Sequence, residues 1–239
     1  MLKMVGFDGD DTLWRSEDYY RAANAEFSAI VGAYVDLDDA EVQARMLATE
    51  RRNLALFGYG AKGMTLSMVE TAIALSEQRI GAPDIERIMA LGRHVLQHPV
   101  VLLPGIRAAV ATVAARYPVV LITKGDLFHQ ERKVAESGLA DQFRRIEIVS
   151  EKNPATYRRL LDEFGVAAHE FAMVGNSLRS DIEPVVRLGG WGVHMPYHVT
   201  WAHELDTQLD PRDAPHVREV AQAGEIPAAV AQLDTLAYA

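Results

Sequence analysis

Three short apolar runs of this chain, 5–7, 119–122 and 171–174, each stop abruptly at a polar or turn residue. The second of them, Val119-Val120-Leu121-Ile122, is uninterrupted and rich in β-branched residues, which is typical of a strand buried on both faces. After the first run and a long insertion, strand, turn and helix patterns alternate, which indicates a parallel sheet with helices on its faces. We therefore predict an α/β fold with a Rossmann-like, doubly wound parallel sheet.

The stretch between the first two runs has a different pattern. Over 15–101, apolar residues recur every three to four positions, as they do in amphipathic helices. Asp38, with a Glu three residues later, is a capping-box start for one of these helices, and Thr65 can cap the next. We predict an all-helical domain at 15–101, inserted into a core domain made of 1–14 and 102–239.

The composition excludes several classes of function. Lys and Arg number 24 against 33 Asp and Glu, and the resulting charge of −9 repels nucleic acid where no basic patch overrides it. The chain has no cysteine, which excludes disulfides and thiolate sites. No apolar run reaches the roughly 18 residues that span a bilayer, and no signal-peptide pattern is present. We expect a soluble, cytoplasmic protein that binds neither nucleic acid nor a membrane.

The carboxyl ends of parallel strands share one edge of a sheet, and ligands bind there. Paired carboxylates repel each other unless a cation or a proton offsets their charge, and hard oxygens are the ligands that Mg²⁺ prefers. Ammonium and hydroxyl groups suit phosphoryl oxygens, and a carboxylate can attack phosphorus to form an acyl phosphate. We expect all these groups to meet at one site. In chain order they are Asp8, Asp10, Thr123, Lys124, Gly125, Lys152, Asn176 and Asp181.

Parts of this set resemble, in order, the four motifs of the haloacid dehalogenase-like hydrolases. They are Asp8-Gly9-Asp10-Asp11-Thr12, Thr123, Lys152 and the segment 175–182. The resemblance covers 1–14 and about 102–195, and the helical insertion after the first motif resembles the helical cap of that family. Two positions depart from the family pattern: Asp11 stands where Gly is common, and Asn176 stands where an acid usually binds the metal.

The resemblance implies a magnesium-dependent phosphatase that acts on a small phosphorylated metabolite. Asp8 would attack phosphorus, and Asp10 would protonate the leaving alcohol and later deprotonate the attacking water. Thr123 and Lys152 would hold the phosphoryl oxygens and offset their charge.

The same resemblance implies a Mg²⁺ site made by Asp8, the main-chain carbonyl of Asp10, and Asp181 or Asn176. Asn176 offers a carbonyl oxygen without a negative charge, so Asp181 would carry more of the charge of the metal. Asp181 has a second interpretation as a helix N-cap, which is a common use of Asp.

Four residues are candidates for binding substrate: Lys124 and Gly125 of the set above, and Tyr59 and Lys62 of the helical insertion. Lys124 and Gly125 follow the second strand, where Lys124 is a surface or substrate-entry residue. The loop Gly58–Met64 is the best candidate for a lid, from which Tyr59 and Lys62 would touch the substrate. An ordinary loop between helices is the other interpretation of this segment.

Other functions stay open. A hydrolytic dehalogenase of a small 2-haloacid would use Asp8 to attack carbon without magnesium, but family dehalogenases lack the second acid, so Asp10 argues against this function. A weakened member of the family could serve as a binding or regulatory protein, which Asn176 favours. A phosphomutase is a further alternative within the same chemistry. The pattern does not identify the substrate or the oligomeric state.

Overall fold

The computed structural model describes residues 1–199 and 208–238. The chain divides by its internal contacts into two compact units. Unit 1 comprises Met1–Arg15, Val100–Lys124 and Gln130–Ala239, and unit 2 comprises Ser16–Pro99 with Gly125–His129. We propose that unit 2 is the inserted helical domain expected from the sequence. Within the described ranges, no helix has the length and apolar character needed to cross a bilayer.

Unit 1 is built on a six-stranded parallel sheet in the order β3-β2-β1-β4-β5-β6. Strand β1 is central and pairs with β2 and β4, so that Phe7 is level with Leu121 and Val174. This sheet confirms the predicted α/β, Rossmann-like fold. The strands are β1 (Met4–Phe7), β2 (Val119–Lys124), β3 (Arg145–Val149), β4 (Phe171–Gly175), β5 (Trp191–His194) and β6 (Val217–Glu219).

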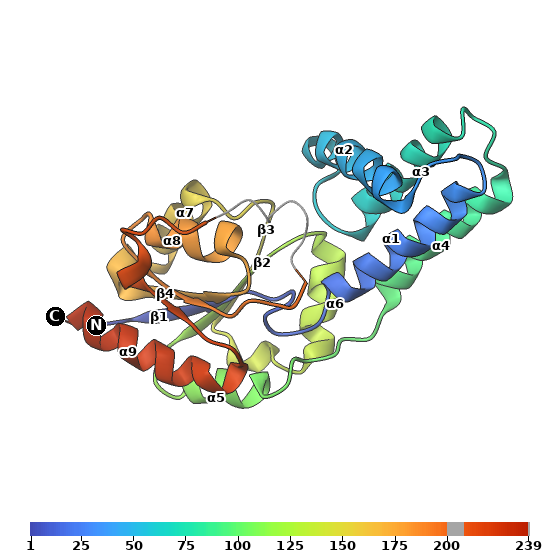
Figure 1. Ribbon diagram of the computed structural model, residues 1–239. Coiled ribbons are helices and arrows are strands. Elements are labelled where there is room, and N and C mark those ends of the chain that lie inside the picture. The colour runs from blue at the N-terminus through green and yellow to red at the C-terminus, as the bar shows by residue number, and fades with distance from the viewer. Residues whose placement is uncertain (200–207, 239) are drawn as a thin grey trace. The chain divides into compact units, whose positions relative to one another are not determined.

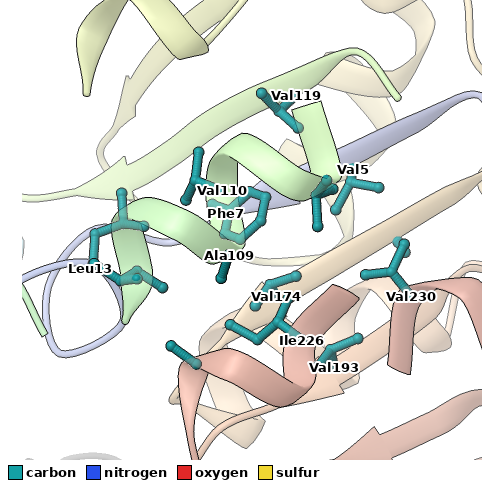
Figure 2. Close-up of a cluster of buried hydrophobic side chains, with 14 of the residues drawn as sticks. Val5, Phe7, Leu13, Ala109, Val110, Val119, Val174, Val193, Ile226 and Val230 are labelled. Carbon is teal, nitrogen blue, oxygen red and sulfur yellow. The ribbon is translucent and has the colours of Figure 1, made fainter. Parts of the chain in front are cut away.

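Alternate residues of the central strands enter two hydrophobic cores. Val5, Phe7 and Val174 belong to the core that includes residues of α5 and α9, as Figure 2 shows. Val120 and Met173 belong to the core formed with α7 and α8. Figure 1 shows α5 and α9 on one side of the sheet and α7 and α8 on the other. Burial of both faces explains the uninterrupted apolar runs. The helices beyond the insertion are α5 (Ile106–Ala114), α6 (Leu127–Ser137), α7 (Pro154–Phe164), α8 (Glu183–Val186) and α9 (Ile226–Tyr238).

Two segments of unit 1 differ from the sequence prediction. The pattern predicts one helix over 181–188, but Leu178–Ile182 forms a π-helical turn and α8 is short. The main-chain N–H groups of Asp181 and Ile182 both donate to Ser177 O, and Pro184 has no N–H to continue a regular ladder. The C-terminal elements β6 and α9 are absent from the sequence prediction. Strand β6 spans only three residues, too few for a pattern. Helix α9 does have a helical pattern, since its buried residues Ile226, Ala229, Val230 and Leu233 recur every three to four positions.

Unit 2 contains four long helices. The predicted capping box is confirmed at the start of the second, where Asp38 Oδ1 accepts from Glu41 N at 2.8 Å and Asp38 N donates to Glu41 Oε2 at 3.2 Å. The helices are α1 (Glu17–Gly32), α2 (Asp39–Phe57), α3 (Ala61–Leu75) and α4 (Ala82–Gln97).

The start of α3 corrects the bounds of the loop that the sequence predicts as a lid. The helix begins at Ala61 rather than at Thr65, after Gly60 with a φ of 112°. Thr65 lies inside α3, where its Oγ1 donates to Ala61 O at 2.6 Å. The loop predicted over 58–64 is therefore limited to 58–60, because glycine allows an abrupt helix start that a search for capping side chains overlooks.

The turn after β1 depends on an unusual backbone conformation at Asp11, which has a φ of 60°. Asp11 N donates to Trp14 O at 2.7 Å, and Leu13 N donates to Gly9 O at 2.8 Å, so the chain folds back tightly. Glycine adopts this left-handed conformation freely and Asp tolerates it better than most residues. This geometry explains how Asp can occupy a position where the family pattern that the first motif resembles commonly has Gly.

We expect Asp11→Gly to be more stable than Asp11→Ala by about 1 kcal/mol, since both remove the carboxylate and only Ala opposes the left-handed backbone. Urea unfolding of the two variants measures the difference. Equal free energies of unfolding would show that the backbone at this position carries no strain.

Candidate active site

A buried ammonium joins three segments at the carboxyl edge of the sheet. Lys152, between β3 and α7, donates from Nζ to Asp8 Oδ1 and, at 2.8 Å, to Asp181 Oδ1. The side chains of Lys152, Asp8 and Asp181 are 1%, 8% and 1% exposed, so this ion triad is shielded from water. The structure thus brings together three residues that lie far apart in the sequence.

The triad carries an excess of negative charge that changes its protonation. Burial raises the pKa of Asp8 to about 7, with a further increase from the Asp181 carboxylate and an opposing effect of Lys152. Burial would lower the pKa of Lys152, but the Asp181 and Asp8 carboxylates outweigh it and the pKa is raised. One ammonium therefore neutralises only part of the charge of two buried carboxylates.

The end of β4 is shaped to receive Asp181. A Cβ atom on Gly175 would lie 2.2 Å from Asp181 Oδ2, so the carboxylate occupies the space that a side chain would fill. Asp181 Oδ2 accepts from Ser177 N at 3.0 Å. The alternative interpretation of Asp181 as a helix N-cap is wrong, because Ser177 has that place and its Oγ accepts from Ser180 N at 3.0 Å.

Thr12 connects the first motif to the fourth. Its Oγ1 accepts from Asn176 N at 3.0 Å and lies 3.1 Å from Asp8 Oδ2 and 3.3 Å from Asn176 Oδ1, to either of which it can donate. Asn176 is therefore held beside Asp8 by a side chain to which sequence reasoning assigned no role. The position of Thr12 within the first motif was the one sequence signal that could have indicated this role.

Asp10 has its own set of partners. Lys133 Nζ lies 2.5 and 2.8 Å from its two carboxylate oxygens, Trp14 Nε1 donates to Oδ1 at 2.6 Å, and Gln130 Nε2 donates to Oδ2 at 3.1 Å. Burial opposes ionisation of Asp10, but Lys133 and the other donors outweigh it and lower the pKa of Asp10. Sequence reasoning missed Gln130 and Lys133, whose spacing of three places them on one face of α6.

The second strand supplies two polar side chains to the same edge. Thr123 is buried, and its Oγ1 accepts from Gln130 Nε2 at 3.1 Å. Lys124 Nζ donates to Ser180 Oγ at 2.8 Å, which places it beside the π-helical turn. The next residue, Gly125, has a φ of 142°, which an L side chain rarely adopts.

The other two candidates for substrate binding belong to unit 2. Tyr59 lies in the short loop before α3, and Lys62 lies in the first turn of α3. Lys62 Nζ donates to both carboxylate oxygens of Asp126 at 2.9 Å. Contact of Tyr59 and Lys62 with a substrate stays a prediction.

The donor set at this edge fits a hard divalent cation. Asp8 and Asp181 offer carboxylate oxygens and Asn176 offers an amide oxygen, which are the ligand types that Mg²⁺ accepts. Lys133 binds both carboxylate oxygens of Asp10. Asp10 would therefore contribute its main-chain oxygen to the cation, as the family resemblance implies. Across 1–199 and 208–238, no cluster of three or more His, Cys, Asp or Glu side chains is arranged around a metal position.

The shifted pKa of Asp8 leads to a prediction about stability. In the unfolded chain Asp8 ionises near 3.8, and in the folded protein near 7, so ionisation opposes folding increasingly from pH 4 to pH 7. Asp8→Asn cannot ionise, so the gain in stability over the parent protein should be larger at pH 8 than at pH 5, by about 2 kcal/mol. Thermal unfolding in the presence of a chelator measures both gains. A gain that is equal at the two pH values would contradict the shift.

The family model "haloacid dehalogenase-like hydrolase" matches residues 2–189. A haloacid dehalogenase-like family hydrolase from Xanthomonas campestris is 56% identical, with 99% of this chain and 94% of that chain covered and a TM-score of 0.88. None of the curated proteins matches the chain significantly.

Two more distant structures share the fold. A predicted phosphoglycolate phosphatase from Haemophilus somnus 129PT is 18% identical, with 94% and 96% of the two chains covered and a TM-score of 0.60. A 2-haloacid dehalogenase from Pseudomonas syringae pv. tomato DC3000 is 20% identical, with 97% and 99% covered and a TM-score of 0.61. At these identities the likeness concerns the fold alone.

Proposed function

Because the chain belongs to the haloacid dehalogenase-like hydrolases, we propose that it is a magnesium-dependent phosphatase of a small phosphate monoester. One observation carries the choice between phosphate and halide chemistry. Asp10 lies two residues after Asp8 and has its own ion pair with Lys133. A phosphate ester with an alcohol leaving group needs a group that donates and accepts a proton, whereas displacement of a halide does not.

In the first half-reaction an Asp8 carboxylate oxygen forms a bond to phosphorus while the bond to the ester oxygen breaks. Asp10 gives its proton to that oxygen, and the alcohol leaves. In the second half-reaction Asp10 takes a proton from water, the water oxygen bonds to phosphorus, and the bond to Asp8 breaks. Free phosphate and the original Asp8 carboxylate result.

The charges around the two acids suit this division of roles. The lowered pKa of Asp10 favours the carboxylate that accepts a proton from water. A bound phosphate dianion would raise that pKa, so the acid form becomes available when substrate is present. Mg²⁺ would supply positive charge next to Asp8, which keeps Asp8 ionised and balances the phosphate. Asp8, Asp181 and Asn176, with the main-chain oxygen of Asp10, would hold it.

The remaining residues bind and orient the substrate in this proposal. Lys152 and Thr123 offset charge on the phosphoryl oxygens. Lys124 and Gly125 lie at the entrance to the phosphate position, and Tyr59 and Lys62 contact the leaving group. The substrate is a small phosphorylated metabolite of the cytoplasm.

A specific observation favours a second candidate, hydrolytic dehalogenation of a small 2-haloacid. Asn176 has no charge, and Lys152 pairs directly with both Asp8 and Asp181, so the triad has a cation of its own for an attack on carbon without a metal. Asp8 would then displace a halide from carbon, and water would hydrolyse the resulting ester. The ion-paired Asp10 has no part in that reaction.

A panel of phosphate monoesters, assayed with and without Mg²⁺, tests the proposal. We expect magnesium-dependent release of phosphate from at least one ester, inhibition by vanadate, and a loss of roughly 10³-fold or more in kcat for Asp8→Asn. Asp162→Asn, an exposed position of α7, is the matched control and should leave the rate unchanged.

Three results would contradict the proposal in different ways. Full activity of Asp8→Asn would exclude Asp8 as the nucleophile. Release of chloride from 2-chloropropionate without a metal would establish the dehalogenase instead. Tight binding of a phosphorylated ligand without turnover would identify a binding protein on this fold.

A further inference from the structure

The Asp10 carboxylate is more accessible than the groups that hold it. Its side chain is 29% exposed, whereas that of Lys133 is 9% exposed and Trp14 and Gln130 are buried. The three donors come from two directions, Trp14 from the turn after β1 and the other two from α6. The carboxylate thus faces outward from a buried support.

Helix α6 directs two of the donors to Asp10. Gln130 and Lys133 are three residues apart and share one face. Arg132, between them in sequence, is 41% exposed and pairs with Glu136 instead. Gln130 Nε2 also lies 3.1 Å from Thr123 Oγ1 and 2.6 Å from Lys124 O, so its two N–H groups are shared among these two oxygens and Asp10 Oδ2, which links Asp10 to the end of β2.

Gln130 makes these contacts at a cost. Its Oε1 is buried and has no hydrogen-bond partner in the described part of the chain. A buried oxygen without a hydrogen-bond partner destabilises a fold, so the presence of Gln130 at this position is not explained by stability. The position of its amide nitrogen between Asp10 and Thr123 supplies that explanation.

The third donor, the indole N–H of Trp14, is positioned by the absence of a side chain at Gly9. A Cβ atom on Gly9 would lie 2.9 Å from Trp14 Cζ2, so the indole ring lies against the main chain between Asp8 and Asp10. The indole N–H then reaches Asp10 Oδ1 at 2.6 Å. A side chain at position 9 would displace the ring.

We propose that Lys133 is a positioning residue which, with Trp14 and Gln130, aims the Asp10 carboxyl at the ester oxygen of the substrate. Oδ1 takes the shorter contacts, from Trp14 and Lys133, so Oδ2 is the less tightly held oxygen and the one that transfers the proton. Proton transfer requires a heavy-atom approach of about 2.6–3.2 Å, which a freely rotating side chain seldom keeps. This inference rests on the proposed phosphatase function.

The test compares substrates that differ in their need for a proton. An alkyl phosphate has a poor leaving group, whereas p-nitrophenyl phosphate departs with little assistance. For Lys133→Met we expect kcat/KM to fall roughly 10- to 100-fold with the alkyl ester and less than about 3-fold with the aryl ester. Lys133→Arg should recover part of the loss, and Arg132→Met, on the same helix, should match the parent protein with both esters.

A double-mutant cycle separates positioning from a general structural effect. In the Asp10→Asn background the added Lys133→Met change should cause no further loss with the alkyl ester, because the group that it positions is already absent. Additive losses, or an equal fall with both esters, would overturn the proposal. Lys133→Gln takes the place of Lys133→Met if the latter does not fold.

A second measurement does not depend on activity. The ¹⁵N–¹H signal of the Trp14 indole, identified by its loss in Trp14→Phe, reports the hydrogen bond to Asp10. It should shift in Lys133→Met and stay in place in Arg132→Met. An unshifted signal would overturn the positioning role even if no phosphate ester is hydrolysed, whereas a shifted signal without any hydrolysis would contradict the proposed function and leave the support of Asp10 established.

Discussion

One buried ammonium links three segments at the carboxyl edge of the sheet. Lys152 reaches Asp8 after β1 and Asp181 in the turn after β4, so a single side chain joins segments that follow three different strands. Loss of this ammonium would leave two buried carboxylates without a counter-charge, which costs several kcal/mol. Burial, with a further contribution from the Asp181 carboxylate, raises the pKa of Asp8. A second cation beside the triad would offset the same unfavourable charge.

The two acids of the first motif are separated by their environments rather than by distance along the chain. Asp8 shares Lys152 with Asp181 in a buried place, and Asp10 has Lys133, Trp14 and Gln130 around a partly exposed carboxylate. Their pKa values consequently move in opposite directions. Such a division is typical of sites in which one carboxylate reacts with the substrate and another transfers a proton.

Much of the fold was predictable because the central strands β1, β2 and β4 are buried on both faces, which their short apolar runs reflect. The capping box at Asp38 was equally predictable, because it depends on two residues three positions apart. The start of α3 was not, since Gly60 allows a helix to begin without a capping side chain, and the π-helical turn before α8 depends on Ser177 accepting two main-chain bonds. Short β6 has too few residues for a pattern.

The sequence by itself determined the family, the parallel sheet and the set of polar residues at the strand ends, because each of these depends on local patterns and motif order. Only the tertiary structure decided how the charges are paired. Lys133 and Gln130 lie on a helix more than a hundred residues from Asp10 in the sequence. The local sequence pattern around them does not indicate that Asp10 is their partner. Ion pairs of this kind depend on which side chains the packed elements bring within a few ångströms, and a linear pattern does not contain that distance.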